Sequence, residues 1–120
     1  MPFPTKTLHA SCTDVVVASA AQVASGNSGV LSGYGPGKLL RVQLDVTAVA
    51  GTAPTLNVIV EDTLDGTTFN TIGPFAQATS VGRQVTNITA PFANRLRVSW
   101  TITGSAGQSF TFSVVLFAEA

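Results

Sequence analysis

The stretch that decides the fold is Leu40-Arg41-Val42-Gln43-Leu44-Asp45-Val46, in which every second residue is aliphatic and the residues between are polar. This alternation is typical of a strand with one buried and one solvated face. The pattern recurs in three further stretches, 56–60, 96–102 and 110–116. Parallel strands are usually buried on both faces, so a clean two-residue period in four strands predicts antiparallel pairing.

Turn residues separate these strands. Ala50–Pro54 predicts a hairpin loop, Asp65-Gly66 a tight turn and Thr103–Gly107 the turn into the last strand. Weaker strands are expected at Phe75–Thr79 and Gln84–Thr89, and no window has a helical period. Many short strands with frequent turns predict an all-β fold, an antiparallel β-sandwich of jelly-roll-like type.

Length and composition fit one compact domain. The chain has 120 residues, of which 45% are hydrophobic and only 10% charged. Six basic and six acidic residues cancel to a net charge of zero, so no basic stripe is present and nucleic-acid binding is not expected. A protein with so little charge repels its neighbours weakly, which favours association with other protein surfaces.

The N-terminal segment differs from the rest. Residues 1–12 are expected to form an extended arm ahead of a sandwich domain at 13–120, because Pro2 and Pro4 cannot donate ladder hydrogen bonds. The arm either contacts its own sheet or a neighbouring subunit, or it is a frayed terminus. The sequence lacks both a run of about 18 apolar residues for a membrane helix and the features of a signal peptide, so we expect a protein made and used without crossing a membrane.

No catalytic constellation is evident. His9 is the only histidine and Cys12 the only cysteine. Three residues apart in a strand, their side chains point to opposite faces, so a Cys-His catalytic pair is rejected. A single thiol also excludes an intrachain disulfide and argues against structural zinc. We therefore predict no enzyme activity, no catalytic residue, no cofactor and no metal ligand.

Three carboxylates lie close together in Glu61-Asp62-Thr63-Leu64-Asp65-Gly66. A glycosidase needs two carboxyls across a cleft, and calcium needs more oxygen ligands than this segment offers. We favour a turn at Asp65-Gly66 with Asp62 accepting backbone N–H groups. Whether Asp62 and Asp65 bind an ion stays open.

Arg41, Arg95 and Arg97 alternate with the buried positions of strong strands and should face water. They either form a small basic patch or pair across strands with Asp45 and Glu61, and cross-strand pairing is favoured.

Several apolar residues occupy strand positions that should face water. Ile59, Val115 and Phe117 lie on the phase that should face water, whereas Trp100 lies on the buried phase of its strand. Ile59, Val115 and Phe117 form either a second buried layer or an interface with another subunit, and the interface is favoured. Together with the arm and with Tyr34 of a Gly/Pro-rich loop, the candidate interface residues are Pro2, Phe3, Pro4, Tyr34, Ile59, Val115 and Phe117.

The segments Ala24–Leu31, Leu40–Val49, Pro54–Val58 and Glu61–Thr67 together resemble small virion proteins encoded in the structural modules of tailed bacteriophages. The resemblance covers the chain from about Val15 to its end and rests on strand and turn patterns. It implies a virion protein made in the host cytoplasm, of the capsid decoration (cement) type. Such a protein would bind and brace the major capsid protein and associate with copies of itself as a trimer.

Two alternatives remain. A neck, tail or head-fibre-base component shares this size and style. A carbohydrate-binding module belongs to a different class, and in it Tyr34 would provide an aromatic platform for a sugar; the other aromatic residues mostly occupy the core phase, which argues against it.

Overall fold

The computed structural model describes residues 12–32, 39–89 and 92–119, and every regular element in these ranges is a strand. The prediction of an all-β, antiparallel protein is therefore confirmed. The described residues contain no helix long and apolar enough to cross a membrane. The predictions for Pro2, Phe3, Pro4, His9 and Tyr34, and for the N-terminal arm up to residue 11, concern residues outside the described ranges. The seven strands are β1 (Cys12–Gln22), β2 (Gly26–Asn27), β3 (Leu31–Ser32), β4 (Leu39–Thr63), β5 (Phe69–Pro74), β6 (Gly82–Ile88) and β7 (Arg95–Glu119).

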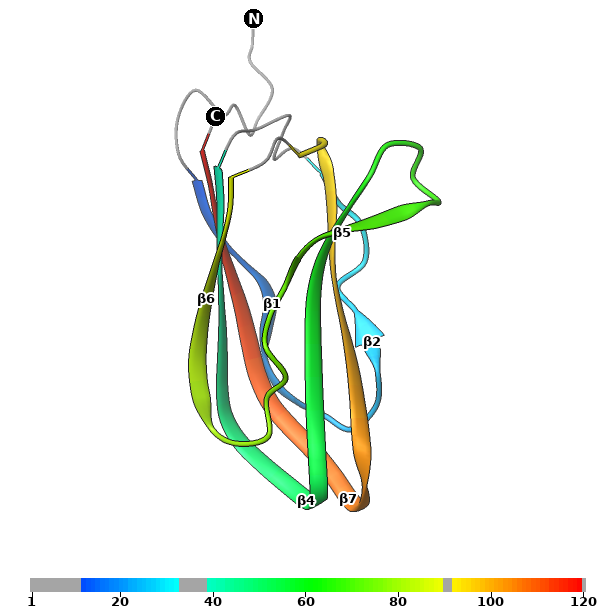
Figure 1. The fold of residues 1–120 in the computed structure, drawn as a ribbon, viewed down its shortest axis with the longest axis vertical. Helices are drawn as coiled ribbons and strands as arrows, with labels where there is room; N and C mark the ends of the chain where they lie inside the picture. Colours follow the sequence, from blue (N-terminus) through cyan, green and yellow to red (C-terminus); the bar gives the residue numbers. More distant parts are fainter. Residues whose placement is uncertain (1–11, 33–38, 90–91, 120) are drawn as a thin grey trace, which may run out of the picture.

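The two longest strands, β4 and β7, pair with each other and turn back on themselves together (Figure 1). Their pairing runs from Leu39↔Glu119 to Ala50↔Ser109 with one register shift between Val46 and Ala48. It shifts register on both sides of Thr52↔Ser105 and is regular again from Thr55↔Thr103. Positive φ angles mark both turns, among them 105° at Gly51 and 145° at Gly104. A Cβ on Gly51 would lie 2.5 Å from the Gln108 Cα, so only glycine fits there. The predicted hairpin loop at 50–54 is thus the point where β4 reverses.

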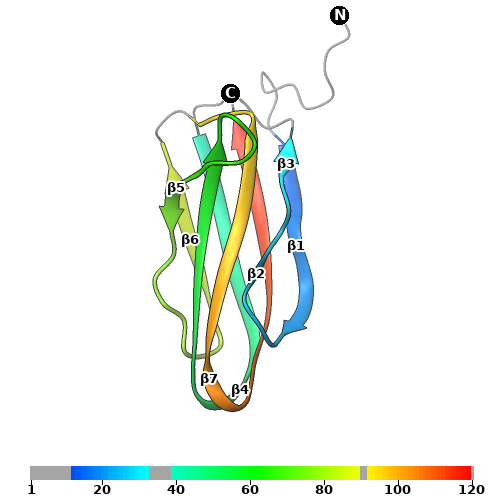
Figure 2. The same cartoon turned by 90° about the vertical axis from the view of Figure 1, so that its right-hand side faces the viewer.

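Each half of the β4–β7 pair is flanked by different strands. Half-sheet A has the order β1, β7 (108–119), β4 (39–50), β6. Half-sheet B contains β7 (95–103) and β4 (54–63), with β2 and β3 beside β7 and β5 beside β4. Figure 2 looks onto half-sheet B, with half-sheet A behind it. The molecule measures 53 × 26 × 22 Å along its principal axes.

The alternating aliphatic residues of both half-sheets form one shared core. Trp100 is 8% exposed, which confirms its expected burial, and its ring meets the Phe112 ring edge-on with centroids 5.4 Å apart. The indole Nε1–H donates to the Ala24 carbonyl oxygen at 3.1 Å, so the polar atom of this buried ring is satisfied. Each fully buried Val, Leu or Phe side chain stabilises the fold by about 1.5–3 kcal/mol. The largest fully buried side chains are those of Phe110, Phe112, Leu40, Leu44, Leu56, Leu96 and Leu116.

One predicted strand is wrong. Phe75–Thr79 forms no regular strand: it contacts β4 through an isolated bridge between Ala78 and Leu56 and a hydrogen bond of 3.0 Å from the Phe75 N–H to the Val58 carbonyl oxygen. The strand expected to start after Pro74 instead ends there as β5, and Phe75 turns into the core at 7% exposure. The Gln84 side-chain amide holds this connection by exchanging two hydrogen bonds of 3.0 Å with the Ala76 backbone. The other weak strand, expected at 84–89, is present as β6.

Candidate functional site

The outer face of half-sheet A carries an apolar row at its centre. Cross-strand neighbours share a face, and Val15, Val115, Gln43 and Val85 are aligned across β1, β7, β4 and β6. Val15 is 64% exposed and Val85 42%, while Val115 is half-buried. The row is thus apolar at three of its four positions and extends across all four strands of half-sheet A. A contiguous exposed apolar surface is a candidate protein-binding site. We call this surface the A face.

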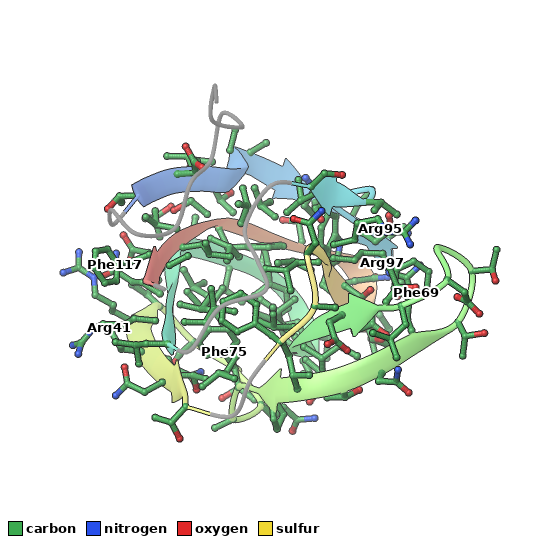
Figure 3. The ribbon with its side chains drawn as sticks, turned by 90° about the horizontal axis from the view of Figure 1, so that it is seen from above. Arg41, Phe69, Phe75, Arg95, Arg97 and Phe117 are labelled. Atoms are coloured by element: carbon green, nitrogen blue, oxygen red, sulfur yellow. The ribbon has the colours of Figure 1, made fainter. Side chains whose placement is uncertain are left out.

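Beside that row, the half-buried Phe117 and the exposed Arg41 are direct neighbours across β7 and β4. Both point away from the core on the same side of the molecule (Figure 3). No ion pair is formed by Arg41 within the described residues. An exposed cation beside an apolar ring and aliphatic side chains is suited to a carboxylate carried on an apolar surface.

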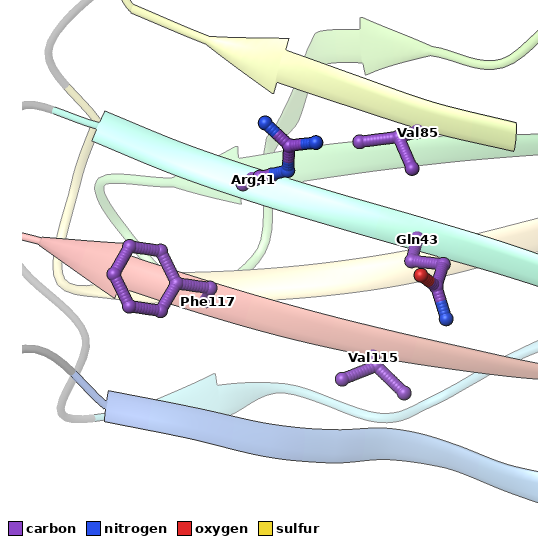
Figure 4. Close-up of a pocket in the computed structure, with 5 residues that line it drawn as sticks. All are labelled: Arg41, Gln43, Val85, Val115 and Phe117. Atoms are coloured by element: carbon purple, nitrogen blue, oxygen red, sulfur yellow. The ribbon is translucent and has the colours of Figure 1, made fainter.

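These side chains enclose a shallow hollow, which we call the Arg41 hollow. It has a volume of about 160 Å³ and is lined by Arg41, Gln43, Val85, Val115 and Phe117 (Figure 4). Small-molecule and cofactor sites usually measure from about 300 Å³ upwards. The Arg41 hollow therefore has the size for one inserted side chain of a partner protein.

The outer face of half-sheet B, called the B face, is built differently. Arg97 lies over the Phe69 ring, with its guanidinium carbon 3.6 Å from the ring centroid, and its Nε–H donates to Glu61 Oε1 at 3.0 Å. The Ser99 hydroxyl donates to the same carboxylate oxygen. Burial alone raises the pKa of Glu61, but the hydrogen bonds from Arg97 and Ser99 and the Arg97 charge outweigh it and hold the pKa below its usual value.

The remaining carboxylates of this segment serve the backbone. Asp65 Oδ1 accepts the N–H groups of Thr68 and Thr67 at 2.7 and 2.8 Å, and these bonds lower the pKa of its carboxyl. Asp62 Oδ2 accepts the Ala93 N–H at 3.0 Å. Both carboxylates thus take the backbone-binding role expected of them, although the Asp62 partner lies 31 residues away in sequence. Within the part of the chain that the structure describes, no cluster of three or more His, Cys, Asp or Glu residues is placed to hold a metal ion.

The predicted arginine pairs are partly confirmed. Arg97 pairs with Glu61 as expected, and the Arg95 guanidinium donates to the Leu64 carbonyl oxygen at 2.9 Å. Asp45 pairs with Arg83 at 3.6 Å, and not with Arg41. Arg83 lies directly opposite Asp45 across the strands, whereas Arg41 is on the same strand as Asp45.

The structure separates the predicted interface residues. Val115 and Phe117 lie on the A face, but Ile59 lies on the B face between Ser99 and Pro74 and is half-buried. Ile59 thus lies on a different face from Val115 and Phe117, because β4 reverses between residues 50 and 54. The interface role of all three residues stays a prediction. Val15 and Val85, the most exposed members of the apolar row, were not expected from the sequence. For Val85, the signal was a valine between the polar residues Gln84 and Thr86.

Comparison with known proteins adds no assignment, since no protein-family model and no curated protein matches the chain. The function is therefore argued from the A face.

Proposed function

We propose that this chain is a non-enzymatic structural protein that binds another protein through the A face. The observation that carries the proposal is the row of exposed and half-buried valines beside the Arg41 hollow. Glu61, Asp62 and Asp65 accept hydrogen bonds from neighbouring side chains or backbone and stabilise the fold. This use of the carboxylates favours a scaffold over an acid–base catalyst.

We further propose that half-sheets A and B form a jelly-roll sandwich. The order of the strands supports the proposal, because each half of the β4–β7 pair is flanked on both sides. In half-sheet A the flanking strands are β1 and β6, and in half-sheet B they are β2 and β3 on one side and β5 on the other. The proposal is also supported by the shared core between the two halves. A sandwich of this kind is a rigid support on which a flat binding face keeps its shape.

Within structural proteins, we propose a capsid decoration protein of a tailed bacteriophage, located in the virion. The resemblance of the turn and strand patterns supports this class, as do the low charge and the exposed apolar row. The partners would be the major capsid protein and copies of the chain itself. A protein that binds the assembled lattice, but not free subunits, stabilises the lattice by mass action.

The test compares two lysine variants in co-sedimentation with expanded capsids of the source phage. Val15→Lys puts an ammonium group at the β1 end of the apolar row on the A face, whereas Thr101→Lys puts the same group on the exposed B face. Burying an unpaired charge costs more than the about 1.4 kcal/mol that corresponds to a tenfold loss of affinity. We expect Val15→Lys to bind at least about tenfold more weakly and Thr101→Lys to bind like the wild type.

Two results would count against the proposal. A folded wild-type protein that does not bind capsids would contradict the decoration role, and equal binding by both variants would contradict the A face. A stained gel of the particle that shows only a few copies of the chain per particle would assign it instead to the neck, tail or fibre base.

A further inference from the structure

The free edges of the half-sheets are not equally protected. An edge strand has unpaired N–H and C=O groups that can pair with another chain, and proteins usually block such edges by short strands, prolines, bulges or inward charges. In half-sheet B, β2 and β3 have two residues each, and β5 is interrupted by a register shift and ends at Pro74.

In half-sheet A, the β1 edge is also blocked. Its pairing with β7 shifts register between Val15 and Val17 and again between Val17 and Ala20. Asp14 pairs with the fully buried Leu116 and so lies on the inward phase of β1, where a charge opposes further strand addition.

The β6 edge has none of these features. All seven residues pair with β4 in continuous register, from Leu40↔Ile88 to Val46↔Gly82, and the strand contains no proline. Its single charge, Arg83, is neutralised by Asp45. Apart from the ladder to β4, the described residues form no backbone–backbone hydrogen bond to β6. Val85, at the centre of the strand, is 42% exposed.

We propose that β6 pairs antiparallel with β6 of a second copy, about a two-fold axis at Val85. In this register Val85 faces Val85, Arg83 faces Asn87 and Gln84 faces Thr86. A β-branched pair at the centre is favourable, and no two like charges stand opposite each other. The two Arg83 residues are offset by four positions, about 13 Å along the strands, which is beyond the Debye length of about 8 Å.

The β6 sequence is thus complementary to itself in the way that an isologous dimer interface requires. The paired strands would join two copies of half-sheet A into one continuous sheet, with the apolar rows of both A faces meeting at Val85. This inference does not depend on capsid binding. It differs from the trimer that the resemblance to phage virion proteins implies, and the mass of the purified protein distinguishes the two.

The experiment measures the mass of the purified full chain by light scattering across a concentration series. We expect the wild type to reach twice the chain mass of 12.3 kDa. Val85→Lys places two ammonium groups opposite each other and should halve the mass. Val30→Lys is the matched control, because Val30 is 46% exposed but lies outside β6, and it should keep the wild-type mass.

A mixing experiment tests the register itself. Val85→Lys and Val85→Glu should each be monomeric alone, and together they should recover the doubled mass because the opposed charges attract. Circular dichroism of each variant verifies the fold. A monomeric or trimeric wild type overturns the proposal, as does a doubled mass that Val85→Lys leaves unchanged or a mixture that stays monomeric.

Discussion

The two outer faces of this protein differ in the surroundings of Arg97 and Arg41. On the B face, Arg97 is held between the Glu61 carboxylate and the Phe69 ring, and Arg95 donates to the Leu64 carbonyl oxygen. On the A face, Arg41 forms no ion pair within the described residues and lies beside the half-buried Phe117. Arg97 and Arg41 both occupy the outward phase of their strands, yet only Arg97 is paired within the described residues, and the A face forms its internal ion pair between Arg83 and Asp45 instead.

The difference separates groups that stabilise the fold from groups that remain available for binding. Glu61 is 7% exposed and accepts from both Arg97 and Ser99, so the hydrogen bonds of this B-face cluster are formed within the fold. The A face instead exposes Val15 and Val85 near Arg41, which forms no ion pair with any described residue. Substitutions on the B face should therefore change stability, and substitutions on the A face should change binding.

The largest stability effect is expected for Glu61→Ala. The substitution leaves the Arg97 guanidinium, only 25% exposed, without its counter-charge. Removing one partner of a well-buried pair costs about 3 kcal/mol or more. Urea unfolding should therefore show a loss of about 3 kcal/mol in the free energy of unfolding. A loss below about 1 kcal/mol, the range of solvated surface pairs, would remove the contrast between the two faces.

A smaller effect is expected from pH. The pKa of Glu61 and that of Asp65 are lower in the folded than in the unfolded protein, so unfolding takes up protons in acid. The stability they contribute is complete above the unfolded values, 4.5 for Glu61 and 3.8 for Asp65, and is lost as the pH falls below them. Glu61→Gln should flatten the acid limb of a urea-midpoint-against-pH curve, whereas Arg41→Gln should keep its slope. Equal slopes for all three proteins would show that the B-face carboxylate is not involved.

The smallest stability effect is expected for Arg41→Gln. Substitutions at exposed positions without partners usually change the free energy of unfolding by less than about 0.5 kcal/mol. The same variant removes the only charge that lines the Arg41 hollow, so its binding to capsids should weaken while its urea midpoint stays constant. A destabilised Arg41→Gln protein would mean that the A face, too, serves the fold.

The sequence alone predicted the long strands and which of their side chains face the core. Alternation at 40–46, 96–102 and 110–116 correctly predicted which side chains are buried, because the two-residue period follows directly from strand geometry. It was insufficient at Phe75, where the chain leaves the ladder after Pro74 and inserts an aromatic side chain into the core. The insertion of the Phe75 side chain depends on the space between the two half-sheets, and a local sequence pattern does not predict that space.

The candidate site was predictable only in part. Val115 and Phe117 were found as apolar residues on the solvent phase, and they do lie together on the A face. Ile59 met the same criterion but belongs to the other face, since the pairing of β4 with β7 decides which half-sheet a residue joins. Val15 is the first residue of Val15-Val16-Val17, where alternation is lost and the β1 register shifts. A continuous apolar run does not indicate which of its side chains face the core. The exposure of Val15 therefore follows only from the pairing of β1 with β7.

The central claim is that the A face is the protein-binding surface. Cryo-electron microscopy of the source particle tests it most directly, by resolving which outer face of this chain contacts the neighbouring protein. We expect density on the outer capsid in which Val15, Val115 and Arg41 are covered by the capsid protein and the B face is open to solvent. A chain bound through the B face, with the Arg41 hollow facing solvent, would contradict it.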